Sequence, residues 1–591
     1  MKKAAAVLAA AFSTALCAHA APPTSIRYTV DIGSPDDRRL HVSMDCSGVR
    51  GTPFEVALPA WSPGWYVLNE ADKRIVDVAA RSMDGAPLVA MSASRRRWRI
   101  EPAGADRVVV EWSVLATDTG SGFFDPAESA DHAFVPGPTT LLHAVGATEV
   151  PCRIRYKTPD GWRIVTGNDP VPGTSDTFEA PNYDTLADHP ADLGRLQRWD
   201  RSVAGVPVTV VAVGPAASLA GPFARRCFDL VDAAARIFGS VPFPRYVFHL
   251  RYSDTRGFLG GLEHANASVI RMPVRSAARV DFDDLRLAAH ELTHAWIVKR
   301  IRPAVLGPFD YSGPVRTPDL WFLEGVTDYF SPRIVVAAGL AGEDLWRGYV
   351  GRQVSEYLSN PARENISLET ASLKVWEDGT SQGYGGLSYY NKGFLAGWWL
   401  DTELRKRTEG ARGIEALVPA LLAQCRERGY APGAIERAAN AIAGADLGAE
   451  WNRWLRSTEP LDFDTVAKDG GWDLVLVGGG LDTGIVWDEA DAGPDRQRVA
   501  NVVPGGPADR AGLRAGDIVV GIADAANRFR GALRGDRLPL EFLRGGQPRT
   551  TALTLTAQAR TEARLSRRPG TSTQTQRRRD QITGMADRAA P

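Results

Sequence analysis

Alternating hydrophobic and polar positions mark two separate parts of the chain as β structure. Short alternating runs such as Ile26–Val30 and Val108–Trp112, separated by turns rich in Gly, Pro and Asp, fill residues 21–200. This period of two predicts an antiparallel β-sandwich-like domain. Alternation returns in residues 470–557, where Pro507–Gly512 predicts a short helix before a β-branched strand.

Residues 201–460 have a different pattern. Two strands, predicted at Tyr246–Tyr252 and Ala267–Met272, flank a glycine-rich bend, and helical spacing of apolar residues dominates afterwards. Residues 322–338 and 389–405 are predicted helices. The chain is therefore expected to be a multidomain α+β protein, with a mainly α domain between two β domains.

The two ends of the chain have compositions of their own. A basic start, an apolar run over residues 4–16 and the small-residue site Ala18–Ala20 predict a secretory signal peptide at residues 1–20. Export to the periplasm or beyond the cell follows from it, and no later stretch has the eighteen apolar residues of a membrane span. Residues 558–591, with eight arginines, three acidic residues and little apolar content, predict a disordered tail.

The amino-acid composition limits the expected binding partners, disulfides and thiolate metal sites. Of 591 residues 44% are hydrophobic and 24% charged, and the net charge of −1 gives no sign of a nucleic-acid partner. Four cysteines follow the signal peptide, an even count that permits disulfides, with Cys46 and Cys152 as one candidate pair. The sequence has no C-x-x-C pair, so a thiolate metal site is not expected.

The sequence His290-Glu291-Leu292-Thr293-His294 lies inside a helical pattern. Histidines four residues apart share a helical face, so His290 and His294 can bind one metal ion. Glu291 lies beside them, within reach of a water activated by that metal. The alternative is a helix whose histidines are merely buried and hydrogen-bonded.

A catalytic zinc site needs a third protein ligand and one open position. Glu324 begins a predicted helix thirty positions after His294 and can supply that ligand. Asp328, one turn later, can accept the free N–H of a ligating histidine. The set predicts Zn²⁺, although two imidazoles and a carboxylate also suit cobalt or manganese. On their own, Glu324 and Asp328 would be an ordinary solvated helix face.

These motifs resemble the glycyl aminopeptidase family of zinc metallopeptidases, within the gluzincin clan. The resemblance covers nearly the whole chain to about Leu555, and the residues that carry it are His290–His294, Trp296, Val298–Pro303, Glu324-Gly325 and Asp328. It implies a thermolysin-like catalytic domain at 201–460 and a PDZ domain at 470–557. It also implies a preference for small N-terminal residues, glycine or alanine. Ile297 departs from the asparagine expected after Trp296, which questions a local hydrogen bond but not the metal.

Residues 257–264 resemble the glycine-rich strand edge of this family. Gly260 and Gly261 would let a peptide backbone approach closely. Glu263 would offer its carboxylate to the free α-ammonium group of the substrate, as an exopeptidase requires. The alternative is an ordinary hairpin bend with a solvated glutamate.

Tyr389–Gly393 is similar to the tyrosine-containing helix start of related zinc aminopeptidases. Tyr390 is the candidate donor to the oxyanion of the tetrahedral intermediate, with Tyr389 as the alternative and core packing as the structural explanation. In the PDZ-like segment, residues 481–486 are the candidate carboxylate-binding loop and neighbouring strand of a peptide groove.

The sequence thus predicts an exported zinc aminopeptidase that removes N-terminal residues by metal-activated attack of water. Two alternatives remain. One is a zinc endopeptidase that cleaves envelope proteins delivered by the PDZ domain. The other is a non-catalytic PDZ scaffold with a relict peptidase fold, against which the complete set of His290, Glu291, His294 and Glu324 argues.

Overall fold

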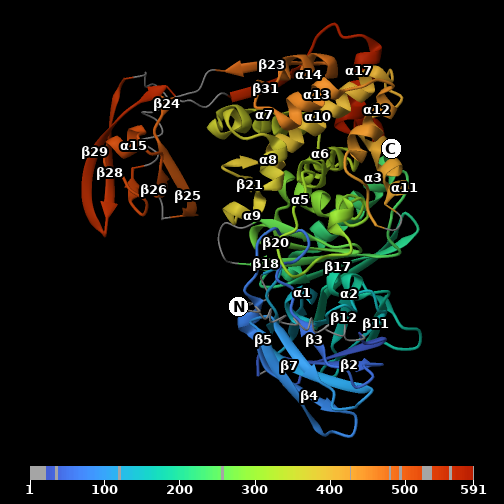
Figure 1. Ribbon diagram of the computed structural model, residues 1–591. Helices are drawn as coiled ribbons and strands as arrows, with labels where there is room; N and C mark the ends of the chain where they lie inside the picture. The colour runs from blue at the N-terminus through green and yellow to red at the C-terminus, as the bar shows by residue number, and fades with distance from the viewer. Residues whose placement is uncertain are drawn as a thin grey trace, which may run out of the picture.

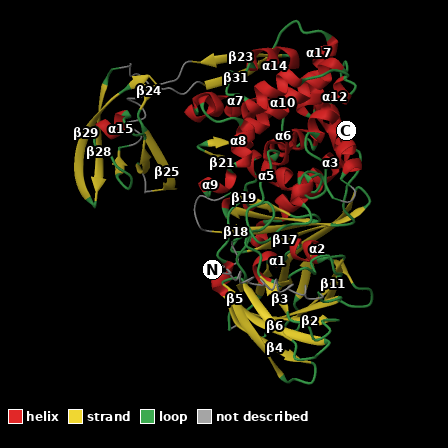
Figure 2. Ribbon diagram, viewed as in Figure 1, coloured by secondary structure: helices red, strands yellow, loops and turns green. Residues whose placement is uncertain are grey.

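The computed structural model describes residues 22–33, 37–117, 122–253, 259–425, 428–477, 481–491, 495–521, 535–557 and 562–589. Figure 1 shows a β-rich N-terminal region below a helical middle region, and a second β region to one side. Colouring by secondary structure separates the same three parts (Figure 2). The multidomain α+β prediction is confirmed, and the predicted signal peptide lies outside the described residues.

The N-terminal region is built on two sheets. The larger has the strand order β10-β3-β6-β5-β4-β7-β2-β1-β11-β14-β13, and the smaller has the order β12-β15-β9-β8. Inward positions alternate as predicted, so Ile26, Tyr28 and Val30 of β1 are buried. The elements are β1 Ser25–Asp31, β2 Arg39–Ser47, β3 Phe54–Ala57, β4 Ile75–Ser82, β5 Pro87–Ser94, β6 Arg97–Glu101, β7 Arg107–Leu115, β8 Ala127–Glu128, β9 His132–Val135, α1 Gly137–Thr140, β10 His143–Ala144, β11 Cys152–Lys157, β12 Arg163–Thr166, β13 Asp169–Pro170, β14 Thr177–Ala180, α2 Tyr183–Asp188 and β15 Ala191–Gly194.

The candidate disulfide between Cys46 and Cys152 is wrong. Both cysteines face Ile26 of β1, Cys46 from β2 on one side and Cys152 from β11 on the other. Two inter-strand spacings place their Cα atoms about 9.6 Å apart, whereas a disulfide requires roughly 4.4–6.8 Å. The four cysteines after residue 21 are all free thiols.

The middle region begins with a five-stranded sheet of order β16-β17-β18-β20-β19, which leaves β19 as an edge strand. Helices follow and cover one face of this sheet (Figure 1). The elements are β16 Gln197–Val203, β17 Val206–Val213, α3 Gly221–Phe238, β18 Tyr246–Ser253, β19 Gly260–Glu263, β20 Ala267–Pro273, α4 Arg275–Ala278, α5 Phe282–Thr293, the π-helical turn η4 Trp321–Val326, α6 Thr327–Ala337, α7 Glu343–Ser359, α8 Leu368–Leu373, α9 Val375–Asp378, β21 Gly383–Tyr384, β22 Leu387–Ser388, α10 Tyr389–Arg407, α11 Leu417–Gln424, α12 Ala434–Ala443, α13 Gly448–Trp451, η7 Asn452–Arg456 and α14 Phe463–Gly470.

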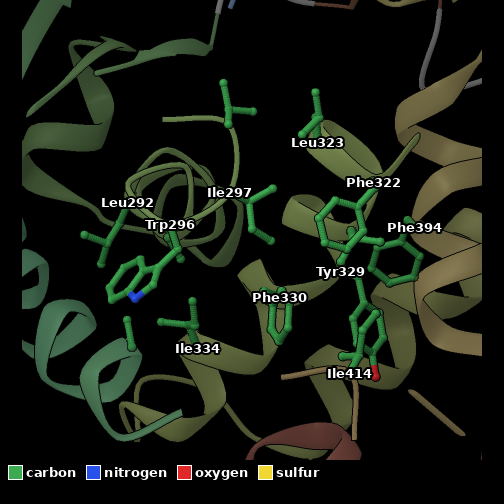
Figure 3. Close-up of a cluster of buried hydrophobic side chains, with 14 of the residues drawn as sticks. Leu292, Trp296, Ile297, Phe322, Leu323, Tyr329, Phe330, Ile334, Phe394 and Ile414 are labelled. Atoms are coloured by element: carbon green, nitrogen blue, oxygen red, sulfur yellow. The ribbon is translucent and has the colours of Figure 1, made fainter. Parts of the chain in front are cut away.

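A single hydrophobic cluster joins the helices that carry the candidate site residues. Figure 3 shows side chains from several of these helices meeting in the cluster. Burial of these large apolar groups is the main force that holds the helices in one arrangement. The labelled residues are Leu292, Trp296 and Ile297 at and after the end of α5, Phe322 and Leu323 of η4, Tyr329, Phe330 and Ile334 of α6, Phe394 of α10, and Ile414.

The C-terminal β region has its own small core and the sheet order β25-β26-β27-β28-β29. It is connected to the middle region by the antiparallel pair β23 and β31, so the chain leaves on one strand and returns on the next (Figure 1). The elements are β23 Trp472–Val477, β24 Leu481–Asp482, β25 Ile485–Asp491, β26 Arg496–Val502, α15 Pro507–Arg510, β27 Ile518–Val520, β28 Arg537–Arg544, β29 Gln547–Thr554, β30 Thr556–Ala557, β31 Glu562–Arg567, α17 Thr573–Thr583 and η8 Met585–Asp587.

The prediction of a disordered tail at 558–591 is wrong for residues 562–589, which we call the C-terminal clasp. Its strand β31 pairs with β23, and its helix α17 buries Ile582 completely. Two of the arginines that suggested disorder, Arg567 and Arg579, meet the buried Glu343 of α7. Composition alone cannot reveal such partners, because they are distant in sequence.

Within the described residues, no helix combines the length and the apolar character that a bilayer crossing requires.

Candidate metal centre

Helix α5 begins with a reciprocal cap. The Asp281 carboxylate accepts the Asp284 amide at 3.0 Å, and the Asp284 carboxylate accepts the Asp281 amide at 3.1 Å. Ala288, Ala289 and Leu292 then turn one face of the helix into the core. His290 and His294, one turn apart, project together from the C-terminal end of this helix.

Glu324 meets both histidines. His290 Nε2 and His294 Nε2 lie 3.0 Å apart, and Glu324 Oε2 lies 3.6 Å from the first and 3.3 Å from the second. A tetrahedral zinc with ligand bonds near 2.0–2.1 Å separates its ligand atoms by about 3.3 Å. The three buried side chains therefore have the spacing that such an ion needs.

One close backbone contact, between Gly325 and Gly393, places Glu324 at this point. Glu324 lies on the π-helical turn η4, a form of helix that often occurs at functional sites. Gly325 packs directly on Gly393 of α10, and a Cβ atom on either glycine would overlap main-chain atoms of the other element. The same contact brings the start of α10, with Tyr390, to the centre.

The charges around Glu324 favour an added cation. Burial raises the pKa of Glu324, but His294 and His290 outweigh it and lower that pKa to about 2. Among the described residues, Glu324 Oε1 has no hydrogen-bond partner. When the two imidazoles are neutral this buried carboxylate lacks a positive charge, and a divalent metal would supply it.

Glu291 lies on the other side of the histidines, against the edge strand β19. A Cβ atom on Gly261 would overlap the Glu291 carboxylate in its present position, so the glycine leaves room for it there. Burial raises the pKa of Glu291 to about 7, with Glu263 and Glu324 adding to the rise and the two histidines opposing it. A carboxylate of that pKa can both accept and return a proton near neutrality.

Each histidine also has a polar neighbour at its other ring nitrogen, Nδ1. His290 Nδ1 lies 3.4 Å from Asp328 Oδ1, which Arg286 also contacts at 2.5 Å. His294 Nδ1 lies 3.3 Å from the main-chain carbonyl of Ile297. That partner belongs to the backbone, so the isoleucine in place of the expected asparagine leaves the contact in place.

The two candidate tyrosines have different surroundings. The ring of Tyr390 stacks on His290, with ring centroids 5.9 Å apart. Tyr389 is fully buried, and its hydroxyl donates to the carbonyl of Ser381 at 2.7 Å. The Tyr389 hydroxyl is therefore used in a structural hydrogen bond, which leaves Tyr390 as the phenol that can face a ligand.

Glu263 ends the edge strand β19 with its side chain buried. Ligand-type atoms of Glu263, Glu291 and His294 lie within 4.8 Å of one another, so this carboxylate borders the metal site. Gly260 is the first residue of the same strand, while Gly257 and Phe258 of the motif lie outside the described residues.

The sequence analysis missed what the N-terminal region contributes. Gly64, in a proline-rich loop, packs so closely on Glu263 that a Cβ atom there would overlap the carboxylate. The Tyr66 amide in the same loop donates to Ser381 Oγ at 2.9 Å. The sequence signal of this loop is the cluster of prolines and tryptophans at residues 59–65, which favours a loop or an edge and indicates no role.

Comparison with protein families agrees with this architecture. The model of the peptidase M61 N-terminal domain matches residues 27–195, that of M61 glycyl aminopeptidase matches residues 283–396, and that of a PDZ domain matches residues 498–526. Along the chain, the matches to the two domain models of this peptidase family are followed by the match to the PDZ model. The second match contains His290, His294, Glu324 and Tyr390.

Among solved structures, an aminopeptidase N family protein from Idiomarina loihiensis has the same fold. It is 21% identical, with a TM-score of 0.82 over 95% of this chain and 99% of that chain. An M1 zinc metallopeptidase from Deinococcus radiodurans is 14% identical, with a TM-score of 0.47 over 75% of this chain and 95% of that chain. No curated protein sequence matches the chain.

Proposed function

With matches to both M61 domain models, we propose that this chain is an exported zinc-dependent aminopeptidase that removes small N-terminal residues, glycine or alanine, from peptides. The observation that carries the proposal is the trio His290, His294 and Glu324, buried and spaced as a tetrahedral metal requires. Export rests on the signal-like segment 1–20.

The roles follow from position. His290, His294 and Glu324 would hold Zn²⁺, and Asp328 would orient His290. Zinc, when bound, supplies the positive charge that acidifies water and polarises a carbonyl. Glu291 accepts a proton from the attacking water and passes it to the departing amine. The Tyr390 phenol donates to the oxyanion.

The edge strand β19 would bind the peptide substrate. An extended peptide can add to such an edge, and Gly260 and Gly261 leave its backbone room. Glu263 pairs with the α-ammonium group of the substrate, which restricts cleavage to the first peptide bond. In the PDZ region, residues 481–486 would begin a groove for a peptide strand.

The first test is hydrolysis of glycyl- and alanyl-arylamides by the zinc-loaded protein. We expect turnover that a chelator abolishes, that zinc restores, and that Glu291→Gln lowers by about 10³-fold. No turnover on these substrates or on N-blocked peptides would reject the enzyme and favour the scaffold alternative.

The endopeptidase alternative is tested with one peptide in two forms, free and N-acetylated. An aminopeptidase cleaves only the free form, because the acetyl group removes the charge that Glu263 binds. Equal cleavage of both forms would favour the endopeptidase.

A further inference from the structure

Lys299 is a buried cation beside the proposed amine site. Its side chain is only 2% exposed, and its ammonium group donates to Asp188 Oδ1 at 2.8 Å. The same nitrogen lies 3.9 Å from Glu263 Oε1, too far for a hydrogen bond. Lys299 is therefore paired with one carboxylate and held near a second.

Asp188 reaches this point from the N-terminal region, as the last residue of α2. Its second oxygen, Oδ2, accepts the main-chain amide of Ala265 at 2.6 Å, so both oxygens are engaged. The neighbouring cation Arg300 instead donates to the main-chain carbonyls of Ala265 and Ala295, at 2.7 and 2.8 Å. Lys299 is thus the cation that Asp188 binds directly.

Glu263 is in the opposite situation. Its side chain is buried, and within the described residues its Oε1 atom has no hydrogen-bond partner. A buried carboxylate oxygen without a donor is costly unless a ligand supplies one. Because Lys299 is balanced by Asp188, the negative charge of Glu263 stays available to a cationic ligand.

We propose that Asp188 is a positioning residue that holds Lys299 away from Glu263, so that Glu263 Oε1 remains open to the α-ammonium group of the substrate. The inference rests on the proposed aminopeptidase function and deepens it. It makes the selection of free N-termini depend on a residue of the N-terminal region, more than seventy positions before Glu263 in the chain.

The cause is competition between two ammonium groups for one carboxylate. A hydrogen-bonded ammonium–carboxylate pair has an N···O distance of about 2.8 Å, so Lys299 Nζ would need to move only about 1 Å to reach Glu263. Without the charge of Asp188, Lys299 loses the carboxylate that holds it in its present position. Lys299 would then neutralise Glu263 and repel the substrate amine.

The test measures binding separately from turnover. The zinc-loaded Glu291→Gln protein is titrated calorimetrically with a glycyl peptide and with its N-acetylated twin, and the ratio of the two Kd values is compared between variants. We expect the parent to prefer the free amine. Adding Asp188→Asn should reduce that preference at least about tenfold, the equivalent of 1.4 kcal/mol.

A third variant, Asp188→Asn with Lys299→Met, removes the competing cation. It should recover most of the preference, which a general loss of folding would not do. The matched control is Asp184→Asn on the same helix α2, since Asp184 accepts the Tyr311 hydroxyl and the Phe309 amide. This control should leave the ratio unchanged.

The outcomes separate the two proposals. A parent that prefers the free amine, with Asp188→Asn showing the same ratio, would overturn the positioning role and leave the aminopeptidase intact. A parent that binds both peptides equally would reject the amine anchor at Glu263, and with it both proposals.

Discussion

Glu324 in the metal centre and Glu415 near the C-terminal clasp have the same shifted pKa for different reasons. Burial raises both pKa values, and cationic or polar neighbours outweigh it and lower each to about 2. For Glu415 the neighbours are two guanidinium groups, Arg333 at 2.8 Å and Arg405 at 2.6 Å. For Glu324 they are the imidazoles of His290 and His294.

The difference separates a structural carboxylate from a ligand site. A guanidinium group keeps its charge at any physiological pH, so Glu415 has permanent counter-charges within the chain. Arg333 also donates to Asp587 of the C-terminal clasp at 3.0 Å, which ties the clasp to α6. The imidazoles of His290 and His294 carry charge only while they are protonated, and they must be neutral to bind a metal, so a bound ion would replace them as the counter-charge of Glu324.

The largest effect should come from Glu324→Gln. Loss of one of three ligands should remove zinc and lower arylamide turnover by about 10³-fold or more. Metal content by mass spectrometry and arylamide turnover check the two parts. Full zinc occupancy in this variant would exclude Glu324 as a ligand.

Glu415→Gln should lower the stability of the protein and leave its zinc content unchanged. Removal of one partner from a buried ion-pair network leaves Arg333 and Arg405 under-compensated, and the free energy of unfolding should fall by about 3 kcal/mol. Zinc content should stay at that of the parent. Urea denaturation measures the first quantity. Arg405 also pairs with Asp401 at 2.9 Å, so a stability equal to the parent would mean that Asp401 and Asp587 suffice as counter-charges.

The pH dependence of stability sharpens the same comparison. The folded pKa of Glu415 is below its unfolded value, so its contribution is present above about pH 5 and is lost as the pH falls toward 2. By pH 3 about 2 kcal/mol of that contribution should be gone. The stability difference between parent and Glu415→Gln should therefore shrink on acidification. A difference that stays constant from pH 7 to pH 3 would contradict this origin of the shift.

Glu459→Gln should have the smallest effect and serves as the control. Glu459 pairs with Arg453 at 3.5 Å, with both side chains more than half exposed. Exposed pairs contribute little, so the change in unfolding free energy should stay below about 0.5 kcal/mol. A loss comparable to that of Glu415→Gln would show that the method does not distinguish buried from exposed charges.

Local patterns predicted the elements that carry the metal centre. The i, i+4 spacing of His290 and His294 is a property of a single helix, and the apolar periodicity around it predicted that helix. The close approach of Glu324 to the two histidines also requires the packing of Gly325 in η4 on Gly393 in α10. The motifs contain both glycines, but no periodicity shows that they pack on each other.

Two errors have one cause. The tail was predicted to be disordered because its composition is polar and basic, yet Arg567 and Asp587 pair with Glu343 and Arg333. Asp188 had no assigned role, yet it binds Lys299 beside Glu263. In both cases the partner lies far away in the sequence, and only folding brings the two charges together.

The order of β, helical and β regions, the paired histidines with Glu291 between them, and the types of residue that suit zinc could all be predicted from the sequence. These follow from periodicity and from chemistry carried within one element. The fold was needed to show that Glu324 lies close to both histidines, that the C-terminal clasp is ordered, and that the N-terminal region borders Glu263. Such contacts join distant segments, and they depend on the packing of the whole core rather than on any local pattern.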